Sequence, residues 1–126
     1  MFLSKLSPVP LSGAAPDGAS TPGAMLTLRK GAGGSIVFQW GASCRPGDTS
    51  YALYEGALGS FTSHVPVLCD VFDTFLSDTP SAGNRYYLVV PSDGAIEGSY
   101  GVDGDGNERL PSASACHPQS FDNCGP

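Results

Sequence analysis

The stretch best suited to chemistry is the short acidic loop between residues 103 and 108. It places oxygen-bearing side chains close together, with glycines that permit a tight turn: Asp103, Asp105, Asn107 and Glu108. Ca²⁺ prefers six to eight oxygen ligands, which loops of this kind often supply. We therefore predict a calcium site at these four residues, with a solvated acidic turn as the alternative.

This loop resembles the opening of an EF-hand loop but departs from that pattern at its end. The twelfth position counted from Asp103 is Ser114, where an EF-hand needs a bidentate glutamate. Any further ligands must come from elsewhere in the chain, such as Glu97, Glu55 or backbone carbonyl groups. Ca²⁺ is the one cofactor that the sequence predicts.

The sequence contains no recognisable catalytic set, so we expect no enzyme activity. A Gly-x-Ser-x-Gly nucleophile motif is absent, and Ser63 directly precedes His64, which is poor geometry for a nucleophile and its base. Nothing places two carboxylates at a defined separation in a cleft, as a glycosidase requires. We interpret His64 and His117 as loop histidines.

Four cysteines form an even set without C-x-x-C spacing: Cys44, Cys69, Cys116 and Cys124. A zinc site would prefer closer ligand pairs, so two disulfides and an oxidising, extracytoplasmic location are the better interpretation. Their order alone allows three pairings. We favour Cys44–Cys69, which would cross-link two strand ends, and Cys116–Cys124, which would staple the C-terminal tail.

Composition limits the class of protein. The net charge is −6, and the six lysines and arginines are scattered along 126 residues, which argues against binding to nucleic acid or an anionic membrane surface. The 17 glycines and 11 prolines suit short strands joined by turns and do not suit a helical bundle. We expect neither membrane insertion nor an intact signal peptide, because no long apolar stretch occurs and residues 1–6 lack an apolar h-region.

Short apolar stretches between turn residues predict an all-β fold with seven strands. Ile36, Phe38 and Trp40 share one face of the second strand, and we expect Trp40 in the core. Pro66 marks an edge strand, whereas 85–90 reads as a central strand buried on both faces. The predicted strands are 25–29, 35–40, 51–55, 65–69, 71–76, 85–90 and 96–102.

These strands predict one β-sandwich over residues 25–111, followed by a disulfide-held surface tail over 112–126. Residues 1–24 are rich in proline, serine, glycine and alanine, so they form either a flexible linker or an extended arm. The apolar residues near the start favour an arm that adds to a neighbour's sheet edge. These residues are Phe2, Leu3, Leu6, Val9 and Leu11.

Several of these stretches resemble the fibronectin type III pattern: Ile36–Trp40, Tyr51–Tyr54, and Gly83-Asn84-Arg85-Tyr86. The resemblance implies an immunoglobulin-like sandwich in which Tyr86 takes the place of the corner tyrosine. Residues 25–126 are also similar to a fibronectin-III-like module that ends many secreted bacterial proteins. That similarity implies an extracellular accessory module without activity and the disulfide pairing favoured above. Asp105 stands where the module usually has a serine.

We therefore predict a non-enzymatic extracellular structural protein. It would be a subunit or module of a cell-surface or filamentous assembly, self-associating through the arm and stabilised by calcium. The alternative is a carbohydrate- or protein-binding adhesion module of a larger secreted protein. Its binding platform would be formed by exposed aromatic residues, with Tyr54, Tyr87, Tyr100 and Phe61 as the candidates.

Overall fold

The structure, a computed structural model, describes residues 11–16, 25–103 and 105–121. A short 3-10 turn, η2 (Ala32–Gly34), joins the first two strands. Within the described ranges, no helix is long and apolar enough to cross a membrane. The strands are β1 (Thr27–Lys30), β2 (Ile36–Gln39), β3 (Ser50–Ala57), β4 (Val65–Val71), β5 (Phe75–Asp78) and β6 (Arg85–Ser92).

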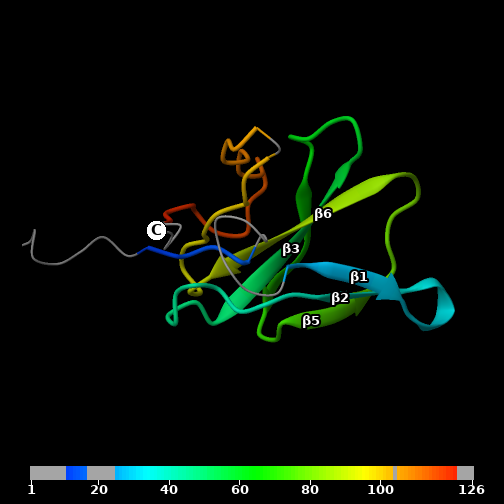
Figure 1. Cartoon of the computed structure of the whole chain (residues 1–126), viewed down its shortest axis with the longest axis horizontal. Helices are drawn as coiled ribbons and strands as arrows, with labels where there is room; N and C mark the ends of the chain where they lie inside the picture. Colours follow the sequence, from blue (N-terminus) through cyan, green and yellow to red (C-terminus); the bar gives the residue numbers. More distant parts are fainter. Residues whose placement is uncertain (1–10, 17–24, 104, 122–126) are drawn as a thin grey trace, which may run out of the picture.

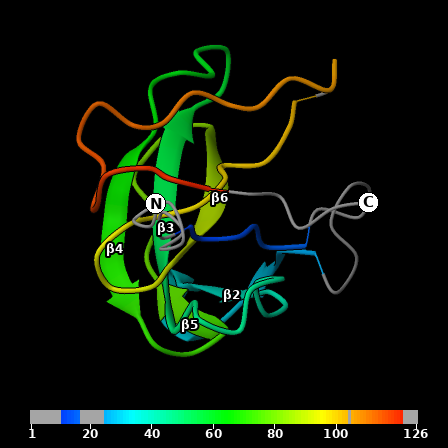
Figure 2. The ribbon, with the colours of Figure 1, turned by 90° about the vertical axis from the view of Figure 1, so that its left-hand side faces the viewer.

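The six strands form two three-stranded antiparallel sheets, in the orders β1-β2-β5 and β4-β3-β6. Figures 1 and 2 show the two sheets as separate layers. The predicted all-β sandwich is therefore confirmed. In the immunoglobulin-type layout, strands A, B and E share one sheet, and C, F and G share the other. Here β1, β2 and β5 correspond to A, B and E, while β3 and β6 correspond to C and F.

The seventh strand, predicted at 96–102, is not formed. Glu97 makes only isolated bridges, to Ser92 and to Gln119. Gly98 N–H donates to the Pro91 carbonyl at 2.8 Å, and the chain then leaves the edge of β6. Residues 96–102 thus begin to add a strand beside β6 but do not continue it, so the position of strand G is not filled by a regular strand of the described chain.

The central strand is β3, and the prediction of a central strand at 85–90 was wrong. β3 pairs with β4 on one side and β6 on the other, and its residues 50–56 are all buried. β6 lies at the end of its sheet, although its residues 88–92 are buried as well. β4, which carries Pro66, lies at the opposite end of this sheet, as predicted for an edge strand.

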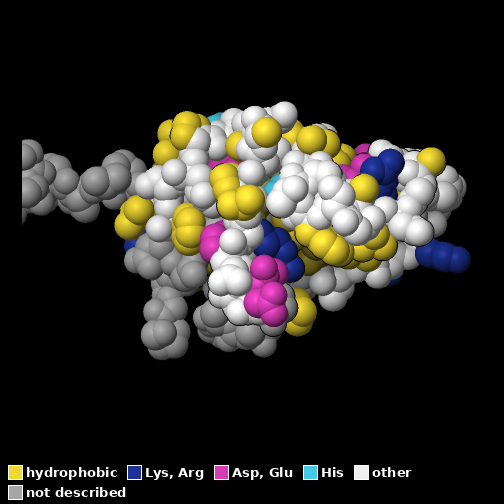
Figure 3. All heavy atoms as spheres, turned by 90° about the horizontal axis from the view of Figure 1, so that it is seen from above, with side chains coloured by type: hydrophobic (Ala, Val, Ile, Leu, Met, Phe, Trp, Pro, Cys, Tyr) yellow, Lys and Arg dark blue, Asp and Glu magenta, His cyan; other side chains and the backbone are white. Residues whose placement is uncertain are grey.

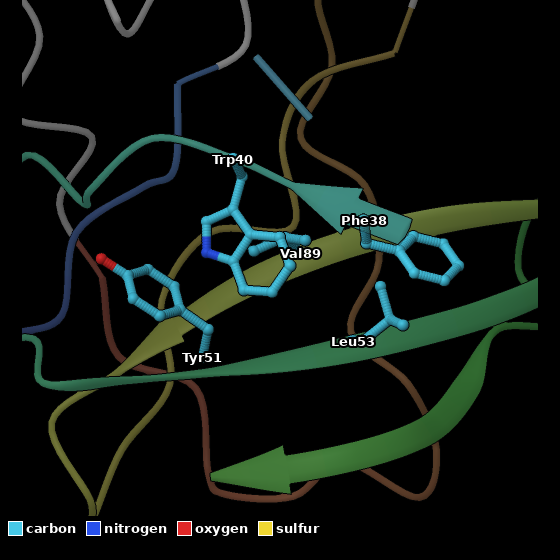
Figure 4. Close-up of a cluster of buried hydrophobic side chains, with 5 residues drawn as sticks. All are labelled: Phe38, Trp40, Tyr51, Leu53 and Val89. Atoms are coloured by element: carbon cyan, nitrogen blue, oxygen red, sulfur yellow. The ribbon is translucent and has the colours of Figure 1, made fainter. Parts of the chain in front are cut away.

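The space between the sheets holds a cluster of apolar side chains (Figure 4). Trp40 is only 4% exposed, which confirms its predicted place in the core, and it packs edge-on against Tyr51 with ring centroids 5.7 Å apart. We call this the inner cluster. Its buried members are Phe38, Trp40, Tyr51, Leu53 and Val89.

A second cluster lies on the opposite face of the β4-β3-β6 sheet, because alternate residues of a strand point to opposite faces. We call it the outer cluster, and its buried members are Ala52, Tyr54, Leu88, Val90 and Tyr100. Irregular segments after β6 cross this face (Figure 2). The predicted surface tail is partly built into this cover, because Ser112 is buried and Cys116 packs against the outer cluster.

The predicted disulfide pairing was wrong. Cys69 is bonded to Cys116, which lies 47 positions further along the sequence, and their Cα atoms are 5.8 Å apart. Cys44 is disulfide-bonded too, and Cys124 lies outside the described residues. The physical reason is the path of the chain after β6, which brings Cys116 across the outer face to the edge strand β4, where Cys69 lies.

The described part of the predicted arm, residues 11–16, is packed into the domain and is not a solvent-exposed linker. Ser12 is fully buried, and its hydroxyl donates to Asp48 Oδ1 at 2.7 Å. Gly13 N–H donates to Asp48 Oδ2 at 2.8 Å, and the Gly13 carbonyl accepts from Ser99 N–H at 2.9 Å. A side chain at Gly98 would collide with this carbonyl, so the close approach requires glycine.

Candidate functional site

The most concentrated polar chemistry of the domain surrounds Glu97, which is fully buried beneath the outer face. Tyr54 donates its hydroxyl hydrogen to Glu97 Oε1 at 2.6 Å, and Tyr100 donates to Glu97 Oε2. Cys116 N–H donates to the Tyr54 hydroxyl oxygen at 2.9 Å. Both carboxylate oxygens therefore have partners, as a buried charged or polar group requires.

Backbone hydrogen bonds place Glu97 in this position. Its N–H donates to the Pro118 carbonyl at 2.8 Å, and its carbonyl accepts from Ser120 N–H at 3.0 Å. Ser12 N–H in turn donates to the Ser120 carbonyl at 2.8 Å. Three segments that are distant in sequence, around residues 12, 97 and 119, are thus held side by side at the carboxylate.

The surroundings of Glu97 keep the two phenols protonated. Burial, reinforced by the hydrogen bond to Glu97, raises the pKa of Tyr54 to about 12. The same two causes raise the pKa of Tyr100 well above its usual range. Near neutral pH both groups therefore act as hydrogen-bond donors, and the arrangement cross-links chain segments through the carboxylate.

His64 is the second buried titratable group of this region, with 1% of its surface exposed. Its Nε2 lies 2.7 Å from the Leu110 carbonyl, which only accepts, so Nε2 carries a hydrogen. Its Nδ1 lies 2.8 Å from the Tyr86 hydroxyl. The interpretation as a loop histidine missed this burial, which is visible only once the chain between β3 and β4 is folded against the outer cluster.

Tyr86 does not form the corner that the resemblance implied. A corner tyrosine bonds to the backbone a few residues upstream. Here the hydroxyl meets His64 Nδ1 and donates to the Ser60 carbonyl at 3.4 Å, so it reaches across to the β3–β4 connection. A Cβ atom on Gly56 would collide with the Tyr86 ring, which is why the end of β3 needs glycine there.

The acidic loop and one predicted binding aromatic line a common surface hollow of about 500 Å³. Phe61 is 61% exposed and Leu110 is 63% exposed, so the hollow combines apolar surface with carboxylates. On the face seen in Figure 3, acidic and basic side chains lie next to each other among hydrophobic ones. Its described lining residues are Phe61, Thr62, Asp103, Asp105, Glu108, Arg109 and Leu110.

Within this loop, two of the four predicted calcium ligands already have protein partners. Asp103 Oδ1 accepts from the N–H groups of Asp105 and Asn107, at 2.9 and 3.0 Å. Glu108 accepts from the Ser99 hydroxyl at 2.7 Å and from Tyr100 N–H at 2.8 Å. Among the described residues, no three metal-ligating side chains gather at one point. Calcium binding here stays a prediction, and the donors present do not form a ready cage.

The carboxylates considered as further ligands are engaged elsewhere. Glu97 is bonded to tyrosines, as described above. Glu55 accepts from the Tyr87 hydroxyl at 2.7 Å and from Ser81 N–H at 3.3 Å. Burial disfavours the charged form of Glu55, but the hydrogen bonds from Tyr87 and Ser81 outweigh it, so the pKa is lowered. Neither carboxylate hydrogen-bonds to a described residue of the 103–108 loop.

The predicted aromatic platform is not formed. Tyr54 and Tyr100 are buried, with 0% and 2% exposed surface, so the prediction of exposed binding residues was wrong for both. Tyr87 is half-buried and packs edge-on against Phe38, with ring centroids 4.8 Å apart. Phe61 alone of the four candidates is strongly exposed.

Comparison with known proteins adds little to these observations. Neither a protein-family model nor a curated protein matches the chain. Among solved structures, the chain is similar to one described as an Fn3-like protein from Clostridium thermocellum. The two share 24% sequence identity, with 72% of this chain and 81% of that chain covered and a TM-score of 0.42. We therefore base the description of the fold on the strands and sheets of this chain.

Proposed function

We propose that this protein is a non-enzymatic extracellular structural subunit, which self-associates into a cell-surface or filamentous assembly through its N-terminal arm. The observation that carries the proposal is the anchoring of residues 11–16 inside the sandwich. Asp48, itself only 9% exposed, accepts hydrogen bonds from Ser12 and Gly13. This anchor fixes the point at which the preceding ten residues join the domain.

The composition of those ten residues supports a role in contact with a partner. Residues 1–10 lie outside the described part of the chain, and five of them have large apolar side chains: Met1, Phe2, Leu3, Leu6 and Val9. Apolar side chains next to an anchored segment favour association, because burying them against a neighbour removes apolar surface from water.

The cysteines support the extracellular part of the proposal. Cys69 and Cys116 are bonded to each other, and Cys44 is also in a disulfide. Disulfides persist in oxidising compartments and are rare in the reducing cytosol.

The buried titratable groups support a non-enzymatic role. Glu97, Tyr54, Tyr100 and His64 all spend their polar atoms on one another or on the backbone. A catalytic acid, base or nucleophile would instead need an atom directed at a bound substrate.

The proposal is tested with the full chain by sedimentation velocity and negative-stain electron microscopy. We expect wild-type protein to form oligomers or filaments and Leu6→Asp to be monomeric, because a charge replaces an apolar contact. Ser7→Asp is the matched control, since it adds the same charge next to that position and leaves every apolar residue in place. Wild-type protein that stays monomeric across all concentrations would contradict the proposal.

The hollow around Phe61 favours a second function, that of an adhesion module. An exposed aromatic ring beside carboxylates suits a carbohydrate, which stacks on the ring and donates hydroxyl hydrogens to the acids. Binding to a glycan array should be lost in Phe61→Ala and kept in Phe72→Ala. Phe72 is the matched control because it is 73% exposed and does not line the hollow. Equal binding by both variants would exclude the hollow as the site.

A further inference from the structure

β6 has an open edge, which is the edge of the strand that faces away from β3. The Pro91 carbonyl points away from β3, because it accepts from Gly98 N–H and from the Ser12 hydroxyl. Residues two apart in a strand present their backbone groups to the same edge, so Val89 and Tyr87 also face away from β3. Among the described residues, no backbone hydrogen bond reaches either of them on this edge.

A groove of about 360 Å³ lies against this open edge. One wall is β6 with Leu88 and Val89, and the other includes Leu28 of β1 and Met25, which precedes that strand. Trp40 contributes to the lining as well. β1 is the end strand of its own sheet, and β6 is the end strand of the other sheet. The groove therefore lies between the end strands of the two sheets, which is where strand G of an immunoglobulin-type sandwich pairs with F.

The surface of this region is largely apolar, although Ser99 and Arg109 also line the groove. Met25 is 52% exposed and Leu28 is 44% exposed. Unpaired backbone groups on one side and apolar side chains on the other are the two features that an added strand needs.

We propose that this groove accepts residues 1–10 of a second copy of the chain as an added strand beside β6. This inference rests on the proposed self-association and identifies its acceptor site. Ten extended residues span about 33 Å, which exceeds the length of β6, so the arm is long enough to pair with the whole open edge.

The sequence of the arm fits an added strand in detail. Pro8 and Pro10 are both at even positions, so every odd residue from Leu3 to Val9 keeps its N–H for pairing with β6. In an extended strand Phe2 and Leu6 share the face opposite Lys5. One face can therefore enter the apolar groove while the lysine remains in water.

Two other occupants from the same chain fit less well. Residues 17–24 connect Pro16 to Met25, but they contain no apolar side chain larger than proline, so they offer less apolar surface to the groove than Phe2 and Leu6 do. A chain's own residues 1–10 would have to reverse direction at the anchored Ser12, because residues 12–16 already run from Pro91 toward the groove, where Pro16 is part of the lining.

The test uses the full chain with a photo-cross-linking residue, Ser4→p-benzoylphenylalanine, in an equal mixture of ¹⁴N- and ¹⁵N-labelled protein. Ser4 shares its predicted face with Phe2 and Leu6 and leaves both intact. Mass spectrometry should find light–heavy cross-linked peptides that contain residues 25–28 or 87–89. Cross-links within single chains, or to any other region, would overturn the inference.

Substitutions of residues that line the groove add a second test to the cross-linking experiment. Leu28→Asp should reduce the light–heavy cross-links by about tenfold, because a carboxylate cannot be buried in an apolar groove without a partner. Leu58→Asp is the matched control, since Leu58 is 54% exposed and does not line the groove. Met25→Asp is a second groove variant, and circular dichroism and thermal unfolding verify that all three remain folded.

The outcomes separate the inference from the proposed function. Assemblies that persist in Leu28→Asp and Met25→Asp, with cross-links that map elsewhere, would overturn the groove and leave self-association standing. Wild-type chains that remain monomeric by sedimentation velocity would overturn both.

Discussion

The two faces of the β4-β3-β6 sheet are buried by different means. The inner face packs against a second sheet, and its cluster consists of apolar and aromatic side chains such as Phe38, Trp40 and Leu53. The outer face is covered by segments without regular secondary structure, and its side chains are tied by hydrogen bonds to Glu97 and to the backbone around Cys116. Two strands, β3 and β6, supply side chains to both clusters.

This difference determines which substitutions each face of the sheet tolerates. An apolar interior depends on filled volume, because a lost side chain leaves a cavity. A polar interior depends on complete pairing, because one missing partner leaves a buried group without a hydrogen bond. The inner face should therefore be sensitive to the size of its residues, and the outer face to their chemistry.

The largest effect should come from removing volume at the inner face. Trp40→Ala should lower the free energy of unfolding by about 4 kcal/mol, because it leaves a large cavity between the sheets. Urea denaturation followed by circular dichroism measures this loss. Trp40→Phe should cost clearly less, and equal losses for the two variants would show that volume is not what the inner face needs.

A somewhat smaller effect should follow from a substitution at the outer face that removes a hydrogen-bond acceptor but keeps a side chain of similar volume. Glu97→Leu should lower the free energy of unfolding by about 3 kcal/mol, because two buried tyrosine hydroxyls lose their acceptor. Glu97→Gln keeps one acceptor oxygen and should fall between this variant and the wild type. If the leucine variant were as stable as the wild type in urea, the outer face would depend on filled volume, as the inner face does, and not on complete hydrogen bonding.

Alkaline pH should act on the outer face through Tyr54. Its folded-state pKa of about 12 lies above the unfolded value of about 10, so the folded state holds the proton more tightly. The resulting stability is fully present below pH 10 and is lost as the pH rises toward 12. Tyrosinate absorbance at 295 nm should show Tyr54 ionising together with unfolding. A normal titration of Tyr54 near pH 10 in the folded protein would contradict this.

The smallest effect should come from the hydrogen bond between His117 and Asp70, which lies at the rim of the outer face. Nε2 and Oδ1 are 3.0 Å apart, and 47% of the Asp70 side chain is exposed. His117→Ala should change the free energy of unfolding by less than about 1 kcal/mol, since solvent screens such pairs. A larger loss in urea denaturation would mean that the neighbouring Cys69–Cys116 region depends on this contact.

The inner face could be predicted from the sequence because its signal is local. Ile36, Phe38 and Trp40 alternate along one strand, and alternation with period two is itself the description of a half-buried strand. The turn at residues 31–34 also follows from local glycines. What this signal does not give is the neighbour of each strand, so 85–90 was placed in the middle of a sheet that has β3 in the middle.

The outer face could not be predicted because its contacts connect segments whose sequences show no regular alternation of apolar residues. Glu97 reads as a surface residue in its own sequence context, and only the pairing with residues 118–120 brings it under the tyrosines. The same long-range path joins Cys69 to Cys116 in place of the nearer candidates. Phe61 and Asp103, which line one hollow, likewise have no sequence signal that links them.

The Ser12–Ser120 hydrogen bond has a consequence for the order in which the parts of the domain fold. It ties one of the earliest described residues to one of the latest, and the contact at Gly98 lies between them in sequence. Such pairings are slow to form, because a long loop must close before any contact offsets the lost entropy. During synthesis the segment at 11–16 therefore waits for residues 97–121 to emerge. The self-association that we propose would therefore begin only after the sandwich has closed and this segment is anchored.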